Sequence, residues 1–183
     1  MDAKVVADTV RVLKNIPRTG WLQRGIHPSI AETVAEHSFE VSSILAMVAM
    51  YADDLLDYKK LLLMGIIHDW GEAVAGDMPR SLTRKLGRET KKITETRIIQ
   101  ELSSISGFSE LFKLFEEYEE KKSQEAIIAK VADLIATLRQ ALEYAQMNYR
   151  VEDIITSCKK ELEGLLKEIK SESICAFLNT LAR

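Results

Sequence analysis

The most apolar pattern in the chain lies at residues 127–136, inside a segment with helical periodicity that spans residues 124–149. A helix that is apolar nearly all round is buried in the core of its protein, so this segment predicts a central helix. Ser123 directly precedes it and is a residue type that commonly caps a helix N-terminus. Asp133 interrupts the apolar run and needs a partner, because burying an unpaired carboxylate is costly.

Helical spacing of apolar residues continues through most of the chain, and the period of two that is typical of strands is not found. The residues Thr33 and Glu36 form a capping-box pattern, and Asp57 is a suitable N-cap for the helix after it. Besides residues 124–149, the pattern predicts helices at residues 2–15, 33–51, 58–75, 88–104, 109–120, 151–170 and 172–181.

Two stretches between these helices, residues 16–30 and 78–87, are predicted as loops. The first contains two prolines and two glycines, which disfavour a regular element. The expected fold is all-α: one domain over residues 1–183, built as a bundle of about seven to eight helices. The helices at residues 151–181 are expected to pack on the rest of this domain.

Composition narrows the class of partner. A chain of 183 residues with 46% hydrophobic and 29% charged residues has the composition of a soluble globular protein with a sizeable core. Its net charge of −3 gives no field for holding a nucleic-acid backbone, so we expect small-molecule partners and no nucleic acid. With no signal peptide, no long apolar run and two distant cysteines, we expect a cytoplasmic protein that does not enter the membrane.

The stretch from Gly65 to Asp77 carries the clearest candidate chemistry. An apolar helical run ends there in His68 and Asp69, and Glu72 and Asp77 follow. An imidazole beside several carboxylates is costly to bury unless the groups are paired or bind a cation. In a continuous helix His68 and Glu72 share one face, and Asp69 lies about 100° around the axis. One turn could therefore supply two metal ligands and a further carboxylate.

Two other helices offer further ligands. The spacing points His37 inward, where a single histidine is most often a hydrogen-bonded core residue. Asp133 has two interpretations: an ion pair with Lys130 three residues earlier, or a bond to a metal. Together His37, His68, Asp69 and Asp133 suit Mn, Fe, Co or Zn better than Ca. Such a site generates a nucleophile from water, so the pattern indicates hydrolysis.

The loop at residues 16–30 contains Arg18, Trp21 and Arg24. These residue types fit a clamp for a phosphate or a base, because an arginine fork matches phosphate oxygens and tryptophan offers a stacking face. A solvated loop with its tryptophan packed on the core has the same composition, and the loop alone favours that interpretation.

Four motifs in this all-helical chain resemble one family. They are PRTGW at residues 17–21, VAEHS at 34–38, HDWGEAVAGD at 68–77 and SQEAIIAKVADLI at 123–135. The order of histidine, histidine-aspartate and aspartate within them resembles the HD-domain metal-dependent phosphohydrolase superfamily. The surrounding residues resemble its 5'-deoxynucleotidase branch, over roughly residues 8–145.

The resemblance implies hydrolysis of deoxyribonucleoside 5'-monophosphates by a homodimer with one divalent Mn, Co, Fe or Zn ion per chain. Arg18 matches the phosphate-binding arginine, and Trp21 falls in the same substrate-side loop. Glu72 matches a carboxylate that assists the attacking water and the leaving group, and Asp77 matches a second acid near the sugar and phosphate. The metal ligands that the resemblance implies are His37, His68, Asp69 and Asp133.

Two alternatives stay open at this point. The chain could be another hydrolase of the same superfamily that acts on a nucleoside triphosphate, a cyclic nucleotide or a guanosine alarmone. It could also be a metal-stabilised helical binding module without turnover, in which Lys130 pairs with Asp133. Residues 78–80 read Met-Pro-Arg where the family commonly has Ile-Thr-Pro, so the sequence does not indicate which nucleotide is preferred.

Overall fold

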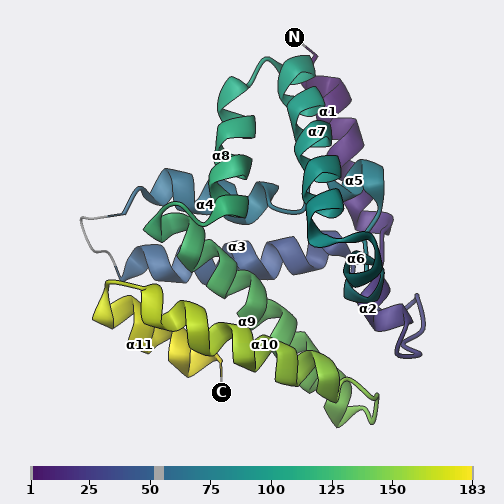
Figure 1. Cartoon of the computed structure of the whole chain (residues 1–183), viewed down its shortest axis with the longest axis vertical. Coiled ribbons are helices and arrows are strands. Elements are labelled where there is room, and N and C mark those ends of the chain that lie inside the picture. Colours follow the sequence, from purple (N-terminus) through teal and green to yellow (C-terminus); the bar gives the residue numbers. More distant parts are fainter. Residues whose placement is uncertain (1, 52–55, 183) are drawn as a thin grey trace.

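The computed structural model describes residues 2–51 and 56–182, and every regular element within these ranges is a helix (Figure 1). The all-α fold class predicted from the sequence is therefore confirmed. In chain order the elements are α1 (Ala3–Val10), η1 (Arg11–Asn15), α2 (Thr19–Leu22), α3 (Val34–Met50), α4 (Tyr58–Ile67), α5 (Glu72–Ala75), α6 (Arg80–Leu86), α7 (Arg88–Ser106), α8 (Ser109–Glu120), α9 (Gln124–Gln146), α10 (Glu152–Leu165), η2 (Leu166–Glu168) and α11 (Glu172–Leu181).

Helix α9 runs through the middle of the molecule, with α3, α4 and α8 packed on one part of its surface and α10 and α11 on another (Figure 1). Its N-cap is confirmed, because the Ser123 hydroxyl accepts a hydrogen bond from the N–H of Ala126. Replacing a fully buried α9 residue such as Leu138 by alanine would cost about 2–5 kcal/mol of stability. The large α9 side chains in the core are Ile128, Leu134, Ile135 and Leu138.

Helices α3 and α4 pack closely because of a glycine. A Cβ atom at Gly65 would overlap the side chain of Leu45, so a larger residue there would require that side chain or the helices to shift. The rings of His37, near the start of α3, and His68, directly after α4, lie with their centroids 5.5 Å apart, so the C-terminal end of α4 is beside the N-terminal half of α3. The caps at the starts of both helices are confirmed: Thr33 and Glu36 form the capping box of α3, and Asp57 accepts the N–H of Lys60.

The helix expected at residues 58–75 is wrong in one respect that matters for the site. Helix α4 ends at Ile67, residues 68–71 form a tight turn, and α5 starts at Glu72. The N–H groups of Trp70 and Glu72 bond to carbonyls three residues earlier, which is tighter than an α-helix. Gly71 lies in this turn against α7, where a Cβ atom would come within 3.2 Å of the Glu95 side chain.

The loop expected at residues 78–87 is also wrong, because residues 80–86 form helix α6. Pro79 precedes the helix with φ of −67°, the value that proline imposes and that suits a helix N-terminus. Gly87 ends it with φ of +89°. The proline and glycine that indicated a loop therefore delimit a short helix. The other predicted loop, residues 16–30, holds the single turn α2.

A second apolar cluster supports the turn after α4. The side chains of Ile67, Ile99 and Phe115 are buried in it, and Val6 of α1 closes one side. Helices α7 and α8 stand next to each other over this cluster, with α1 against α7 (Figure 1). Within residues 2–51 and 56–182, no helix combines the length and apolar character that crossing a membrane requires.

Candidate metal centre

Three side chains from two neighbouring elements converge in the interior. His37 comes from α3, and His68 and Asp69 come from the turn that follows α4. One ligand atom from each lies within 4.8 Å of the others. Nε2 of His68 is 3.2 Å from Oδ2 of Asp69, and Nε2 of His37 is 3.9 Å from the same oxygen. The structure therefore brings together the residues that the sequence placed on two separate helices.

Asp133 of α9 reaches the same cluster with one of its two oxygens. Oδ1 lies 3.0 Å from Nε2 of His37. Oδ2 accepts hydrogen bonds from Nζ of Lys130 at 2.6 Å and from the hydroxyl of Tyr118 at 3.3 Å. The ion pair with Lys130 and an approach to the histidine cluster are therefore compatible, because they use different oxygens.

The donor atoms of this cluster fit a divalent cation. Nδ1 of His68 donates to the carbonyl of Gly65 at 2.9 Å, so the neutral ring carries its proton there and leaves a lone pair on Nε2. Nε2 of His68 is buried, and no hydrogen-bond partner is found for it within the described residues. Two imidazole nitrogens and two carboxylate oxygens form the mixed donor set that Mn, Fe, Co or Zn accept.

The charge state of the two aspartates supports this interpretation. Burial alone would raise the pKa of Asp69, but its interactions with His68, His37 and Arg18 outweigh burial and lower it well below its ordinary value. The pKa of Asp133 is also lowered, against the effect of burial, by Lys130 and by the hydrogen bond from His37. Both carboxylates are therefore ionised at neutral pH and available to a cation.

Arg18 lies directly before α2, and its charge interacts with the carboxylates of Asp69 and Asp133. Its Nη1 donates to Oγ1 of Thr137 at 3.2 Å and lies 3.7 Å from Oε2 of Glu32. Burial would lower the pKa of Arg18, but the negative charges of Glu32, Asp69, Asp133 and Asp77 outweigh burial and raise it. The arginine is therefore a permanent cation beside a strongly acidic centre.

Asp77 is held against the loop that carries Arg18. Its Oδ2 accepts the N–H of Thr19, and its carbonyl accepts the Thr19 hydroxyl at 2.9 Å. Gly76, just before it, has φ of +74°, a conformation that other residues rarely adopt. Asp77 therefore bonds to Thr19, the residue that follows Arg18. From the sequence, only the resemblance to the family had placed Asp77 and Arg18 at the same site.

Glu72 is the first residue of α5 and is 4% exposed. Its Oε1 lies 3.6 Å from Nζ of Lys91 on α7, and its Oε2 is buried without a hydrogen-bond partner among the described residues. Burial and the nearby charges of Asp69 and Asp77 raise the pKa of Glu72 well above its ordinary value. This carboxyl group is therefore suited to carry a proton near neutral pH.

Lys91 and Glu95 are site neighbours that the sequence did not reveal. Nζ of Lys91 lies 3.3 Å from Oε1 of Glu95 as well as close to Glu72. Burial raises the pKa of Glu95 to about 7. Residues spaced four apart with opposite charges are common on solvated helix faces, so their spacing gave no signal of this role.

Trp21 is placed in the core rather than on an open surface. The residue is 2% exposed, and its indole N–H donates to Oε2 of Glu32 at 2.9 Å. Its ring meets the edge of Tyr144 with centroids 5.1 Å apart. Contact of Trp21 with a substrate stays a prediction. Arg24, from the same loop, binds Asp153 of α10 instead.

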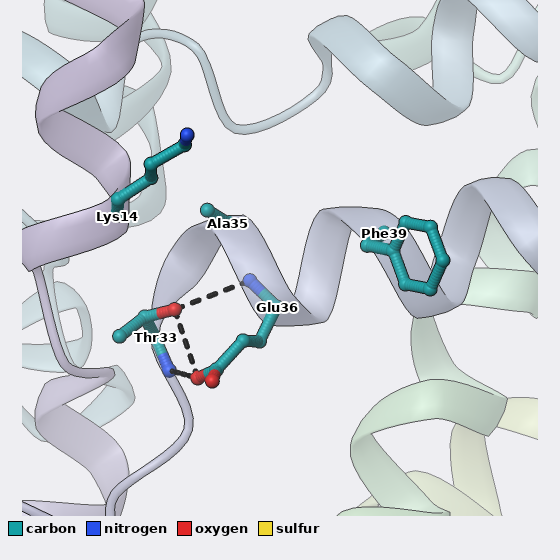
Figure 2. Close-up of a pocket in the computed structure, with 5 residues that line it drawn as sticks. All are labelled: Lys14, Thr33, Ala35, Glu36 and Phe39. Atoms are coloured by element: carbon teal, nitrogen blue, oxygen red, sulfur yellow. Dashed lines mark hydrogen bonds between the residues drawn. The ribbon is translucent and has the colours of Figure 1, made fainter.

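A separate surface hollow of about 340 Å³ lies between η1 and the start of α3 (Figure 2). Its α3 residues include Ala35 and Phe39, each two positions from His37 and therefore on nearly the opposite side of the helix. The hollow is thus distinct from the metal centre. The side chains that line it are Lys14, Thr33, Ala35, Glu36 and Phe39.

Comparison with known sequences gives one family. The family model described as HD domain matches residues 10–170. The protein named 5'-deoxynucleotidase HDDC2 of Dictyostelium discoideum is 31% identical over 156 residues, covering 78% of this chain and 77% of that protein. The HDDC2 of Homo sapiens is 29% identical over 87% of this chain and 80% of its own length. The 5'-deoxynucleotidase YGK1 of Saccharomyces cerevisiae is 26% identical over 94% of this chain and 78% of its own length.

Solved structures share the fold along its whole length. A conserved hypothetical protein from Pyrococcus furiosus superposes with a TM-score of 0.81 at 27% identity and covers 98% of both chains. A protein from Magnetospirillum magnetotacticum, described as a predicted metal-dependent phosphohydrolase, has a TM-score of 0.70. At 22% identity, over 97% of this chain and 88% of that one, the second likeness concerns the fold alone.

Proposed function

The chain belongs to the HD domain family, and we propose that it is a metal-dependent 5'-deoxynucleotidase. It would hydrolyse deoxyribonucleoside 5'-monophosphates to the deoxyribonucleoside and phosphate. The observation that carries this proposal is the convergence of ligand atoms from His37, His68 and Asp69 within 4.8 Å, together with the half-buried Arg18, whose charge interacts with Asp69. The relatives named 5'-deoxynucleotidase, which align over most of this chain, support the substrate class.

Four side chains would hold the cation: His37, His68, Asp69 and Asp133. Bound there, a divalent ion supplies Lewis acidity toward the phosphoryl group and a nucleophile at neutral pH. Their mixed nitrogen and oxygen donors support Mn, Co, Fe or Zn, one ion per chain. The hydrogen bond from His68 to Gly65 and the ion pair of Asp133 with Lys130 orient two of these ligands before any ion binds.

Arg18 would bind the phosphate. A phosphate monoester carries up to two negative charges, and an arginine fork can donate two parallel hydrogen bonds to its oxygens. The contacts with Thr137 and Glu32 fix the guanidinium in place. Charge that develops on the phosphoryl oxygens therefore meets a donor that needs no reorganisation.

Glu72 would exchange protons with the reacting groups. Its raised pKa lets the protonated carboxyl group donate to the departing 5'-oxygen, while the ionised form can accept a proton from water. Asp77 would lie near the sugar and phosphate, because it is bonded to the loop that carries Arg18. The side chain of Asp77 is therefore the second candidate for the proton donor.

We include a single domain, a homodimer and a cytoplasmic location in this proposal. Cys158 and Cys175 form no disulfide, which supports a reducing compartment. The dimer follows from the resemblance to the family. It is supported by two exposed apolar side chains of α3, Phe39 at 76% and Met50 at 86%, which a second copy could cover.

A phosphate-release screen tests the activity. Protein reconstituted with Mn²⁺ or Co²⁺ is offered deoxyribonucleoside and ribonucleoside 5'-monophosphates, triphosphates and cyclic nucleotides, with Asp69→Ala as control. The proposal predicts fastest release from the deoxyribonucleoside monophosphates and loss of release in the variant. Turnover of triphosphates or cyclic nucleotides alone would point to another HD-type hydrolase, and metal binding without turnover would point to a binding module.

A further inference from the structure

Glu32 is a buried carboxylate that lies between the metal centre and the substrate loop. It is 6% exposed and lies in the connection just before α3. Both of its backbone groups are fixed: its N–H donates to the hydroxyl of Tyr144 at 2.8 Å, and its carbonyl accepts the N–H of Arg18 at 2.9 Å. The carbonyl bond ties Glu32 to the residue that carries the guanidinium, and the Glu32 side chain is buried.

The two oxygens of this carboxylate face different groups. Oε2 accepts the indole N–H of Trp21 at 2.9 Å and lies 3.7 Å from Nη1 of Arg18. Oε1 lies 3.7 Å from Nδ1 of His37. Because Trp21 binds Oε2, the other oxygen stays available to the histidine.

Nδ1 of His37 needs an acceptor when the opposite nitrogen binds a cation. A neutral imidazole that ligates through Nε2 carries its proton on Nδ1, and a buried N–H without a partner is costly. In this structure Nδ1 of His37 is fully buried, and no hydrogen bond to it is found within the described residues. Oε1 of Glu32 lies 3.7 Å from this nitrogen, so a small shift closes the bond.

We propose that Glu32 is a positioning residue that holds the His37 imidazole with Nε2 toward the metal and holds the Arg18 guanidinium toward the phosphate. The inference rests on the proposed function and adds to it one carboxylate that contacts both the metal-binding histidine and the phosphate-binding arginine. Partners of this kind orient metal-binding histidines and raise their basicity. Through Glu32, the loop that binds phosphate and the helix that binds the metal are fixed relative to each other.

Metal affinity separates this role from a purely structural one. Glu32→Gln keeps the shape of the side chain, but it loses the charge opposite Arg18 and cannot accept from both Trp21 and His37. Calorimetric titration with Co²⁺ alone should show a dissociation constant about 10–100-fold higher than that of the wild-type protein. At saturating Co²⁺ the variant should also show a raised KM for a deoxyribonucleoside monophosphate.

Tyr144→Phe is the matched control. It removes the hydroxyl that bonds to the backbone N–H of Glu32 and to the carbonyl of Ile30, and it leaves both carboxylate oxygens in place. We expect it to lower the Tm of the apo protein. Its Co²⁺ affinity should stay within about threefold of wild type, since neither a metal ligand nor the carboxylate of Glu32 is changed. Glu32→Asp keeps the charge but withdraws the oxygens from His37, so it should also weaken Co²⁺ binding. This variant provides the test if Glu32→Gln fails to fold.

The outcomes distinguish this inference from the function on which it rests. Co²⁺ binding by Glu32→Gln and Glu32→Asp with wild-type affinity, whatever their Tm, would overturn the role of Glu32 alone. Failure of the wild-type protein to bind Co²⁺ would overturn the proposed function and this inference with it. Weakened Co²⁺ binding in both variants, with binding retained in Tyr144→Phe, would establish the positioning role.

Discussion

Nζ of Lys130 lies 2.6 Å from Oδ2 of Asp133, while Oδ1 of the same carboxylate lies 3.0 Å from Nε2 of His37. One side chain therefore takes part in an ion pair and faces the metal centre at the same time. The ion pair neutralises part of the charge that burial makes costly, and it fixes the oxygen that a cation would use. The two interpretations that the sequence left open for Asp133 are therefore compatible: the ion pair with Lys130 is present, and the bond to a metal stays a prediction.

Substitution of each partner in turn separates the roles of this pair. Asp133→Asn should weaken Co²⁺ binding by more than the roughly 10–100-fold that outer-shell changes cost, because it removes a ligand. Lys130→Met should keep measurable Co²⁺ binding, because it leaves Oδ1 of Asp133 facing His37. Calorimetry on both proteins gives the comparison. Equal losses in the two variants would mean that Asp133 serves only the ion pair.

Arg18→Lys should lower kcat/KM for deoxyribonucleoside monophosphates by about 10²–10³-fold, with Co²⁺ binding intact. Lysine keeps the charge but lacks the fork that matches two phosphate oxygens. Arg24→Lys is a matched control, since Arg24 lies in the same loop and pairs with the exposed Asp153. Steady-state kinetics should show the control close to wild type, and a similar defect in both variants would remove Arg18 from the phosphate site.

Lys91→Met should lower the free energy of unfolding by about 1–3 kcal/mol, because it removes the polar partner that the buried carboxyl groups of Glu72 and Glu95 share. Lys92→Met changes the next residue of α7, whose long 3.8 Å contact with Glu120 is at the surface, and should leave stability unchanged. Urea unfolding of the two apo proteins measures the difference. Stability equal to wild type in Lys91→Met would show that this lysine does not support the site.

The start of α9 should respond to pH through Glu125. Burial would raise the pKa of Glu125, but the N–H of Asp57 and the charge of Lys60 outweigh burial and lower it. A lowered pKa stabilises the fold above the ordinary glutamate value of about 4.3, and this contribution is lost as the pH falls through the pKa of the folded state. Glu125→Gln should therefore be about 1 kcal/mol less stable than wild type at pH 7.

This deficit should shrink as the pH falls below the ordinary pKa of glutamate, because wild type then loses the same charge. Urea unfolding at pH 7 and at acid pH measures it. The exposed Glu163 of α10 provides a control, and Glu163→Gln should follow wild type at every pH. A deficit of Glu125→Gln that is constant with pH would show that its charge does not contribute to stability.

The structure could be predicted correctly from the sequence where it depends on residues that are close together along the chain. The caps at Thr33, Asp57 and Ser123 were predicted correctly because each bonds an N–H three residues ahead. The break after Ile67 was missed because the turn is formed by N–H groups that bond three residues back, and the pattern of apolar residues does not distinguish such a turn from a helix. Helix α6 was missed because proline and glycine also occur as helix boundaries.

The residues of the candidate site also differ in whether the sequence alone reveals them. Histidines and carboxylates within apolar runs identified His37, His68 and Asp133 as inward groups, because an unpaired polar group there is costly. Glu32 and Lys91 carry no such signal: one precedes a capping box in an irregular segment, and the other has the spacing of a solvated face. Their contacts with His37 and Glu72 exist only after the helices pack.

The most direct test of the metal centre is an anomalous difference map from crystals of the wild-type protein grown with Mn²⁺ or Co²⁺. We expect one strong peak per chain at about 2.0–2.3 Å from the coordinating atoms. These are Nε2 of His37 and His68, Oδ2 of Asp69 and Oδ1 of Asp133. A peak elsewhere, or a wild-type chain without one while the ion binds in solution, would contradict the account.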